Sequence, residues 1–509
     1  MRTSVRSTRI AVLCGFLLIL VWMLYPSHTS EEKPEHLVQS RAPTIAVLPS
    51  TSIPEAHPTT IIPQPAPQAD TTTWAPEQEV GVTIPTEPAD TAVAAANNFP
   101  DETNLLGLNG RPKLPIERII EEHFREPEDD GSHLDHAMLQ EYVKSINDLG
   151  YPKFWRLECP GESQPGKRYE VLRRIGKEEP GIKYFFALDL FQIVNVLPRL
   201  MGSILQAIKY LGPENCAISI IEGRSTDGTY LVLHKLRHTL QELGVRYWLE
   251  QSDIDPHGEG VDRIAELSKL RNMALEPLLY NTEEFTTDPL ILFVNDIAVC
   301  TDDLLELLYQ HLLQNATQTC AYDWVDGGHL HYDAWVSRSM SGNTFFEIPQ
   351  DMSWAFSRNM FWDEPISKAK YKKQEPLQVF SCWGGMSVLD AKPFMSGDIE
   401  FRRSYEGECY SGEPTTLASD LVKLNISRVQ TVPYVAVAYN DHAGASAKGV
   451  HKYVKDWVDV DTLVERFEDD TKTTRIEWRP PPPRYRCMPS FVDCWWVDSV
   501  WDPNSSTAK

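Results

Sequence analysis

Basic residues are in short supply in this chain. Lysine and arginine together number 48 against 72 aspartates and glutamates, and the formal net charge is -24. A surface with this excess of negative charge repels phosphate groups, so we exclude nucleic acid and anionic membrane surfaces as partners. The sequence also lacks CxxC pairs and Cys/His spacings typical of metal sites, which argues against the common structural zinc sites.

The N-terminal apolar run, residues 10–25, is shorter than the ~20 residues that usually span a bilayer. Three arginines precede it and two glutamates follow it, which favours a cytoplasmic N-terminus. It lacks a clear small-x-small cleavage site after it. We therefore expect residues 1–9 to be a cytoplasmic tail and residues 10–25 an uncleaved signal-anchor, in a single-pass type II protein of the Golgi or another secretory membrane. A cleaved signal peptide is the alternative.

Residues 26–115 lack cysteine and are dominated by Pro, Thr, Ala, Ser and Glu. Such a composition cannot bury enough apolar area to offset chain entropy, so we expect a disordered stem.

Eight of the nine cysteines follow the stem. An oxidising lumen would let some of them pair, and the closely spaced Cys487 and Cys494 are a candidate disulfide. Sequons at Asn315, Asn425 and Asn504 predict N-glycosylation if this part of the chain enters the lumen.

Strands and helices alternate from about residue 183 onward. Apolar runs at residues 183–190, 216–222, 245–250 and 291–294 predict buried strands, and helical spacing separates them. The first helix has Asn195 as a plausible N-cap and Gly212 as its stop, and the later ones cover residues 230–243 and 262–279. This order predicts an α/β, doubly wound, Rossmann-like domain with ligands at the carboxyl ends of its strands.

Two of these strand ends carry acidic residues. Glu222 closes the second strand, where a carboxylate can accept hydrogen bonds from a nucleoside base or ribose. Asp227 lies in the turn that follows, where capping of the next helix is a sufficient alternative role. On the helix of residues 262–279, Arg263 and Arg271 fall outside the apolar face, and an arginine there suits a diphosphate.

The fourth strand ends in Asn295 and Asp296. Their oxygens are hard ligands suited to Mg²⁺ or Mn²⁺ bridging nucleotide phosphates, so Asp296 is our principal metal candidate. Asp302 and Asp303 precede another helical run, and we expect them to cap it and complement its dipole.

Seven motifs occur in order between residues 181 and 440: "LPRLMGSILQAIKYLGPENCAISIIEGRSTDGT", "RIAELSKLRNMALEPL", "FVNDIAV", "YDAWVSRSMSG", "VFSCWGGMSVLDAKPF", "FRRSYEGECYSGE" and "VPYVAVAY". Together they resemble the fungal cryptococcal-type α-1,3-mannosyltransferases and capsule-associated proteins, glycosyltransferase family 69. The resemblance implies a GT-A-like nucleotide-sugar fold, a divalent metal (Mn²⁺ or Mg²⁺), GDP-mannose as donor and an α-mannoside as acceptor. "FVNDI" stands where such enzymes carry Asp-x-Asp, yet only Asp296 is acidic, so we expect single-carboxylate metal binding.

The domain boundaries follow from this resemblance. We expect residues 116–180 to be the N-terminal part of the lumenal region, residues 181–465 the GT-A-like domain, and residues 466–509 a Pro- and aromatic-rich tail that docks on the domain or on a partner.

Retention of configuration, as an α-linked product would require, needs either a carboxylate nucleophile or same-face attack guided by the leaving phosphate. The candidate carboxylates are Asp333, Asp390, Glu408, Glu413 and Asp420.

The predicted site residues divide by role. The catalytic set is Asp296, Glu413 and Asp420; the donor set is Glu222, Asp227, Arg271 and Asn295; the acceptor set is Asp333, Trp335, Arg338 and Trp383; and the metal set is Asp296 with His442, where Asp441 is an alternative to His442. Trp383 precedes two glycines, so its indole could face a sugar ring or be plain core. Two other functions stay open: a catalytically silent relative acting in capsule polysaccharide assembly or export, and a transferase that uses another nucleotide sugar.

Overall fold

The computed structural model describes residues 131–160, 165–349, 351, 353–458, 475–490 and 493–502, which lie within one compact unit. The strands are β1 Ile182–Leu190, β2 Cys216–Glu222, β3 Arg246–Gln251, β4 Phe285–Val294, β5 Gln318–Val325, β6 Leu330–His331, β7 Leu377–Gln378, β8 Met386–Asp390, β9 Val429–Val437, β10 Arg484–Cys487 and β11 Trp495–Asp498. The α-helices are α3 His136–Asn147, α4 Glu170–Ile175, α5 Leu197–Leu211, α6 Thr229–Glu242, α7 Arg263–Tyr280, α8 Thr301–Gln314, α9 Pro365–Lys372, α10 Lys392–Met395, α11 Glu413–Lys423, α12 Asp441–His451 and α13 Val454–Trp457.

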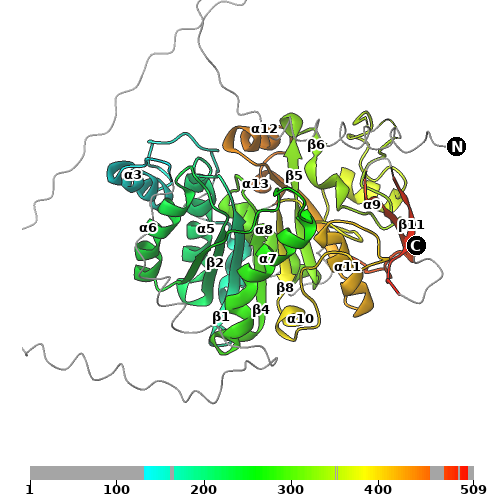
Figure 1. The fold of residues 1–509 in the computed structure, drawn as a ribbon, viewed down its shortest axis with the longest axis horizontal. Helices are drawn as coiled ribbons and strands as arrows, with labels where there is room; N and C mark the ends of the chain where they lie inside the picture. Colours follow the sequence, from blue (N-terminus) through cyan, green and yellow to red (C-terminus); the bar gives the residue numbers. More distant parts are fainter. Residues whose placement is uncertain are drawn as a thin grey trace, which may run out of the picture. The chain divides into compact units, whose positions relative to one another are not determined.

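One mixed sheet runs through the middle of the fold, with helices packed on both faces (Figure 1). Its strand order is β3-β2-β1-β4-β8-β5-β9-β7, with β6 added to β5. The pairs β3-β2, β2-β1, β1-β4 and β5-β9 are parallel, whereas β8 is antiparallel to both β4 and β5. The fold is therefore mixed α/β, and a parallel β3-β2-β1-β4 half supplies four strand ends at one edge.

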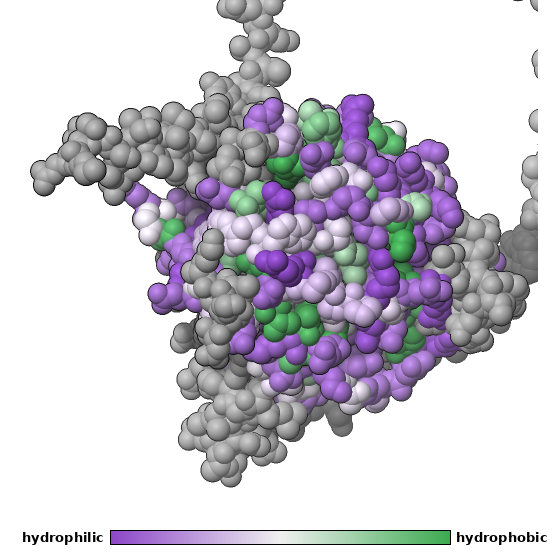
Figure 2. All heavy atoms as spheres, turned by 90° about the vertical axis from the view of Figure 1, so that its right-hand side faces the viewer, coloured by the Kyte–Doolittle hydropathy of each residue, from purple (hydrophilic) through white to green (hydrophobic). Residues whose placement is uncertain are grey.

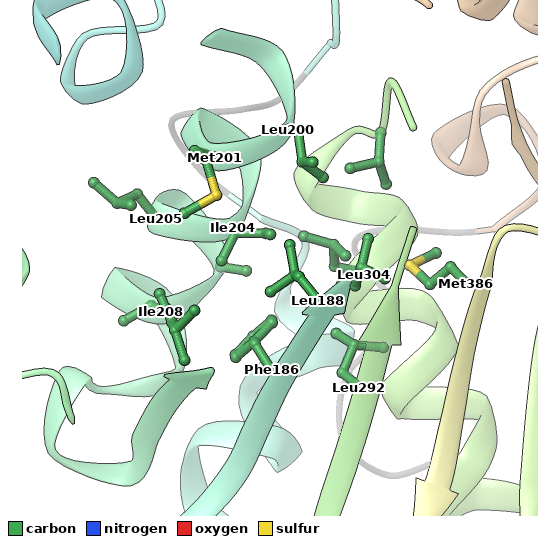
Figure 3. Close-up of a cluster of buried hydrophobic side chains, with 14 of the residues drawn as sticks. Phe186, Leu188, Leu200, Met201, Ile204, Leu205, Ile208, Leu292, Leu304 and Met386 are labelled. Carbon is green, nitrogen blue, oxygen red and sulfur yellow. The ribbon is translucent and has the colours of Figure 1, made fainter. Parts of the chain in front are cut away.

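Both faces of the central strands are buried, which explains their continuous apolar runs. Phe186 and Leu188 of β1 point into a core built with α5 and α8, where Leu200, Ile204 and Leu304 meet them (Figure 3). Their neighbours Phe185 and Ala187 belong to the opposite core, which α7 covers with Leu270, Ala274 and Leu278. Alternation along the strand thus serves two separate cores. Outside, the face seen in Figure 2 is mostly hydrophilic, with small apolar patches.

The four predicted strands and the helices between them are confirmed, and Gly212 ends α5 at a φ of 100°. Asn195 as N-cap is wrong: α5 begins at Leu197 after Val196, without a side-chain cap. The helix cap after β4 is confirmed, because Asp303 accepts a hydrogen bond from the backbone of Cys300 in a capping box. Lys448 holds the other oxygen of Asp303 at 2.6 Å in a buried ion pair, so Asp303 is a structural residue.

The described part of the C-terminal tail docks on the domain. Gln378 forms a two-way hydrogen-bond pair with the backbone of Arg479, and the antiparallel β10-β11 hairpin follows (Figure 1). The predicted docking of the tail on the domain is confirmed for these residues.

Three disulfides join segments far apart in the sequence: Cys159–Cys300, Cys320–Cys382 and Cys409–Cys487. The predicted Cys487–Cys494 pair is wrong, because the hairpin brings Cys487 to the loop before α11, while Cys494 accepts a hydrogen bond from Arg486.

Within the described ranges, none of the helices has the length and apolar character needed to span a membrane. The expected anchor at residues 10–25, the stem at residues 26–115 and the sequon at Asn504 lie outside those ranges. Asn315 and Asn425 are exposed, each at a left-handed backbone position where α8 or α11 has ended.

Candidate active site

Asp189 is an acidic residue inside the apolar strand β1, near its carboxyl end. Burial raises the pKa of its carboxyl group to about 7, and the Arg271 guanidinium pulls this pKa down. The charges of Asp296, Glu413 and Glu222 raise it as well. Four charged groups, Arg271, Asp296, Glu413 and Glu222, therefore act on Asp189. Sequence reasoning missed Asp189, whose signal was a lone carboxylate in a largely apolar strand.

Asp296 follows β4, and hydrogen bonds of its neighbour Asn295 hold the strand end in place. The backbone N–H of Asn295 donates to Gly385 O at 3.0 Å, and its side-chain oxygen accepts the indole N–H of Trp383 at 3.1 Å. Burial raises the pKa of Asp296 to about 6. Asn295 thus supports the site through Trp383, in place of the direct donor contact that the sequence suggested.

Arg271 reaches the site from α7 and meets Glu413, the first residue of α11. The guanidinium Nη1 lies 2.9 Å from the Glu413 carboxylate in a buried ion pair. An aromatic cage surrounds the guanidinium, with the Trp383 ring centre 4.0 Å away and Phe293 and Phe401 at 5.6 Å each. Cation–π contacts of this kind hold a planar guanidinium in one orientation.

Trp383 is 1% exposed, so its rings are not open to a sugar. The predicted contact of Trp383 with the acceptor sugar is wrong, because one face of the indole covers Arg271 and its N–H donates to Asn295. The adjacent Gly384 has a φ of 68°, and a Cβ there would lie 2.0 Å from Ala321 O. Only glycine fits this approach, which lets the Gly384 N–H donate to Asp333 at 2.8 Å.

Asp333 is partly exposed beside a second, fully buried carboxylate, Asp323 of β5. Asp323 accepts from the Tyr439 hydroxyl at 2.7 Å and lies 3.1 Å from His331 Nδ1. Burial and the charge of Asp323 raise the pKa of Asp333 well above its ordinary value. The exposed Tyr332 packs edge-on against Tyr439, with ring centres 4.9 Å apart. Asp333 therefore stays available to a ligand hydroxyl, as the sequence suggested.

Glu222 and Asp227 act inside the protein. Glu222 is buried and accepts from the Ser225 backbone at 2.9 Å and from the Gln251 amide at 3.2 Å. Asp227 accepts from Thr229 with one oxygen and from the Val194 backbone with the other. Both residues shape the loop after β2, and their donor contacts stay predictions.

Three further predictions are corrected. Arg402 holds both oxygens of Asp420, at 2.8 and 2.9 Å, and also pairs with Glu408. This gives Asp420 a structural role in place of the catalytic one. Arg338 is 0% exposed and donates to the backbone carbonyls of Trp335, Ser337 and Arg486.

The Trp335 indole N–H donates to Met488 O at 2.6 Å. Arg338 and Trp335 thus hold the tail through hydrogen bonds to its backbone, in place of the predicted contacts with an acceptor sugar. Asp390 was another candidate carboxylate. Its Oδ1 lies 3.0 Å from Nε2 of the buried His311.

His442 is exposed at the start of α12, and its ring stacks on Trp155 with centres 4.0 Å apart. Asp441 instead accepts the Leu157 backbone N–H at 2.8 Å. Among the residues that the structure describes, no three His, Cys, Asp or Glu side chains gather closely enough to hold a metal ion. Asp296 and His442 as metal ligands stay predictions.

Sequence comparison gives the class of this protein, the glycosyltransferases. The family model described as cryptococcal mannosyltransferase 1 matches residues 183–420. The α-1,3-mannosyltransferase CMT1 of Cryptococcus neoformans var. neoformans is 34% identical over 339 residues, covering 64% of this chain and 70% of that protein. The chain belongs to the cryptococcal mannosyltransferase family.

Solved structures give weaker likenesses. Staphylococcus aureus TarS 1-349 is 15% identical and has a TM-score of 0.30, covering 51% of this chain and 60% of that one. The mannosyltransferase PcManGT of Pyrobaculum calidifontis, solved with GDP-Man and Mn²⁺, is 11% identical with a TM-score of 0.30, covering 63% and 66%. At these scores neither likeness carries an argument about this chain.

Proposed function

We propose that this protein transfers mannose from GDP-mannose to an α-mannoside, forming an α-1,3 linkage with retention of configuration through a GT-A-type domain. The observation that carries the proposal is the caged Arg271 beside Asp189 and Asp296 at one strand edge, in a chain of this family. Breaking the glycosidic bond to a diphosphate builds negative charge on the leaving group. A fixed guanidinium stabilises that charge without reorganisation.

The charge balance of the site favours a divalent cation. The charges of Asp296 and Glu222 both raise the pKa of Asp189, and Arg271 is already paired with Glu413. A donor diphosphate entering this site adds further negative charge. A cation such as Mn²⁺ fits one protein carboxylate, Asp296, with the remaining ligands from phosphates and water, as is common for such ions. It would supply Lewis-acid stabilisation of the leaving diphosphate.

Two acidic residues are our candidates for the retaining step. Glu413 pairs with Arg271, and Asp189 lies near the carboxyl end of β1. Either would serve as a nucleophile, and same-face attack guided by the leaving phosphate is the alternative. On the acceptor side, Asp333 and the exposed Tyr332 supply a hydrogen-bonding group and an aromatic edge.

We also propose a Golgi or other secretory location, with the chain anchored by residues 10–25. Three disulfides and the exposed sequon residues Asn315 and Asn425 support an oxidising, glycosylating lumen.

A transfer assay tests the activity. The full chain in detergent is incubated with labelled GDP-mannose, Mn²⁺ and α-mannobiose, alongside Asp296→Ala and a control, Asp493→Ala, whose exposed carboxylate lies in the tail. We expect transfer by the wild type and the control, and at least ~100-fold less by Asp296→Ala, the range seen when charge-stabilising groups are removed. Inactivity of the wild type with every donor in a GDP- and UDP-sugar panel would favour the silent, assembly-type alternative.

A further inference from the structure

Phe191 is the first residue after β1, and 45% of its surface is exposed. The residue before it, Leu190, is fully buried, and Asp189 of the candidate active site comes one position earlier. A large aromatic side chain is therefore left open to solvent at the edge where the parallel strands end. Ligands of parallel α/β sheets bind at this edge, so an exposed ring there is positioned to meet one.

The loop that carries Phe191 is tied down. Gln192 adopts a φ of 55°, and its N–H donates to Ser225 Oγ at 2.8 Å. The next two N–H groups, of Ile193 and Val194, donate to the side chains of Thr229 at 3.0 Å and Asp227 at 2.9 Å. These bonds join the loop after β1 to the loop after β2. The ring is thus presented on a preorganised support, which lowers the entropy lost when a ligand stacks on it.

One neighbour of the ring is a glycine. A Cβ built on Gly223 would lie 3.7 Å from Cβ and Cδ2 of Phe191. Any longer side chain at this position would extend over or around the ring. The loop after β2 consequently comes close to the Phe191 side chain without covering it.

The strand order decides which part of the donor would meet Phe191. Asp296 follows β4, and the acceptor-side groups Asp333 and Tyr439 lie by β5 and β9. Phe191 lies on the other side of Asp296, at the ends of β1 and β2. A donor whose sugar sits between Asp296 and the acceptor must extend its nucleoside towards β1 and β2.

We propose that Phe191 stacks on the nucleobase of the donor nucleotide. The inference rests on the proposed function, because it takes the donor to be a nucleotide sugar. A planar base matches a flat, rigid ring, and stacking of this kind tolerates any base. Phe191 therefore contributes affinity for the nucleotide, while selection of guanine is left to polar groups.

Nucleotide binding tests the inference without any need for turnover. GDP is titrated, with Mn²⁺ present, into the full-length wild type, Phe191→Ala, Phe191→Leu and Phe191→Trp. The matched control is Phe356→Ala, because Phe356 is 43% exposed and lies in a different loop. Thermal melting of each variant establishes that it is folded.

We expect Phe191→Ala to weaken GDP binding about tenfold, within the range for loss of one base–aromatic stack. Phe191→Leu keeps apolar bulk without a ring and should be nearly as weak, whereas Phe191→Trp and Phe356→Ala should bind like the wild type. Equal GDP affinity of folded Phe191→Ala and wild type overturns the stacking inference and leaves the proposed function intact. If the wild type binds no nucleotide from a GDP, UDP and ADP panel, the inference fails together with the proposed function.

Discussion

The Arg271 guanidinium lies 2.9 Å from the Glu413 carboxylate and 4.0 Å from the centre of the Trp383 ring. Arg271 comes from the middle of α7, Glu413 is the first residue of α11, and Trp383 precedes β8. Three segments thus meet around one cation. The arrangement fixes the position of the Arg271 charge, as the proposed contact with a diphosphate requires. The ion pair also links these segments to one another.

Removal of both partners should cost less than the sum of the two single removals. Arg271→Ala leaves the Glu413 carboxylate buried and unpaired, and we expect it to lower the free energy of unfolding by about 3 kcal/mol. The double variant Arg271→Ala/Glu413→Ala should lose clearly less than the sum of the single variants. Urea denaturation of all three measures the coupling. Additive losses would mean that the pair is not energetically coupled in solution.

Arg271→Lys separates charge from geometry. The variant keeps the charge but lacks the planar fork and the flat face that stacks on Trp383. We expect kcat for mannosyl transfer to fall roughly tenfold or more, as after loss of a positioned charge-stabilising group. Lys269→Arg, on the exposed side of the same helix, is the control. Wild-type kcat in Arg271→Lys would show that a point charge suffices.

Asp189 should make stability depend on pH. Its pKa is raised to about 7 in the folded protein, whereas an unfolded aspartate has a pKa of about 3.9. Below pH ~4 the carboxyl group is protonated in both states, so it has no effect on the free energy of unfolding. Between pH ~4 and ~7 the unfolded chain releases the proton more readily, and the folded state becomes progressively less stable.

Asp189→Asn removes this titration. We expect the variant to match the wild type at pH 4 and to be more stable by roughly 2 kcal/mol at pH 8, less than the full pKa difference implies because Asp189 is partly exposed to water. Denaturant unfolding at several pH values, with a chelator present, measures the difference. A gain that is the same at pH 4 and pH 8 would contradict the assignment.

Two glycines with similar backbone angles should respond differently to alanine. Gly384→Ala puts a Cβ 2.0 Å from Ala321 O, while the same change at Gly397, where φ is 76°, meets no atom of the described chain within 4 Å. Gly397→Ala should therefore cost only the left-handed strain of about 1 kcal/mol. Gly384→Ala should lower the melting temperature far more and displace Asp333. Similar melting temperatures for the two variants would refute the close approach at Gly384.

The docking of the tail on the domain should depend on Arg338. Arg338→Ala leaves the carbonyls of Trp335, Ser337 and Arg486 without their donor, and we expect a loss of roughly 3 kcal/mol for several unmet buried groups. Limited proteolysis should then cut between residues 475 and 502 sooner than in the wild type. Arg358→Ala, an exposed arginine outside the tail, is the control and should be cut at the wild-type rate.

The four central strands and their helices could be predicted because their patterns are local. Strands β1 and β4 contain continuous apolar runs at residues 184–188 and 290–294, where both faces are buried, and such runs are visible without any knowledge of partners. The acidic cap of α8 was predictable for the same reason, because a cap is satisfied within one turn. The strand end at Asp296 followed from this order, since ligands of parallel sheets gather at carboxyl ends.

Partners distant in the chain could not be predicted. The sequence predicted that Trp383 and Arg338 bind the acceptor and that Asp420 is catalytic. In the structure Trp383 packs on Arg271, Arg338 hydrogen-bonds to the tail, and Asp420 pairs with Arg402. The cysteine pairing failed similarly, because it depends on where the hairpin folds back.

By itself the sequence determined the elements, their order and the strand edge at which the site lies, because hydrophobic periodicity and capping act over a few residues. Only the tertiary structure decided which polar side chains face a ligand. That outcome depends on whether another segment has already met their hydrogen bonds and charges, and burial makes such partners obligatory. Asp189 and Phe191, two positions apart, are candidates on this ground alone: Arg271 and other charged groups act on Asp189, and the side chain of Phe191 remains exposed.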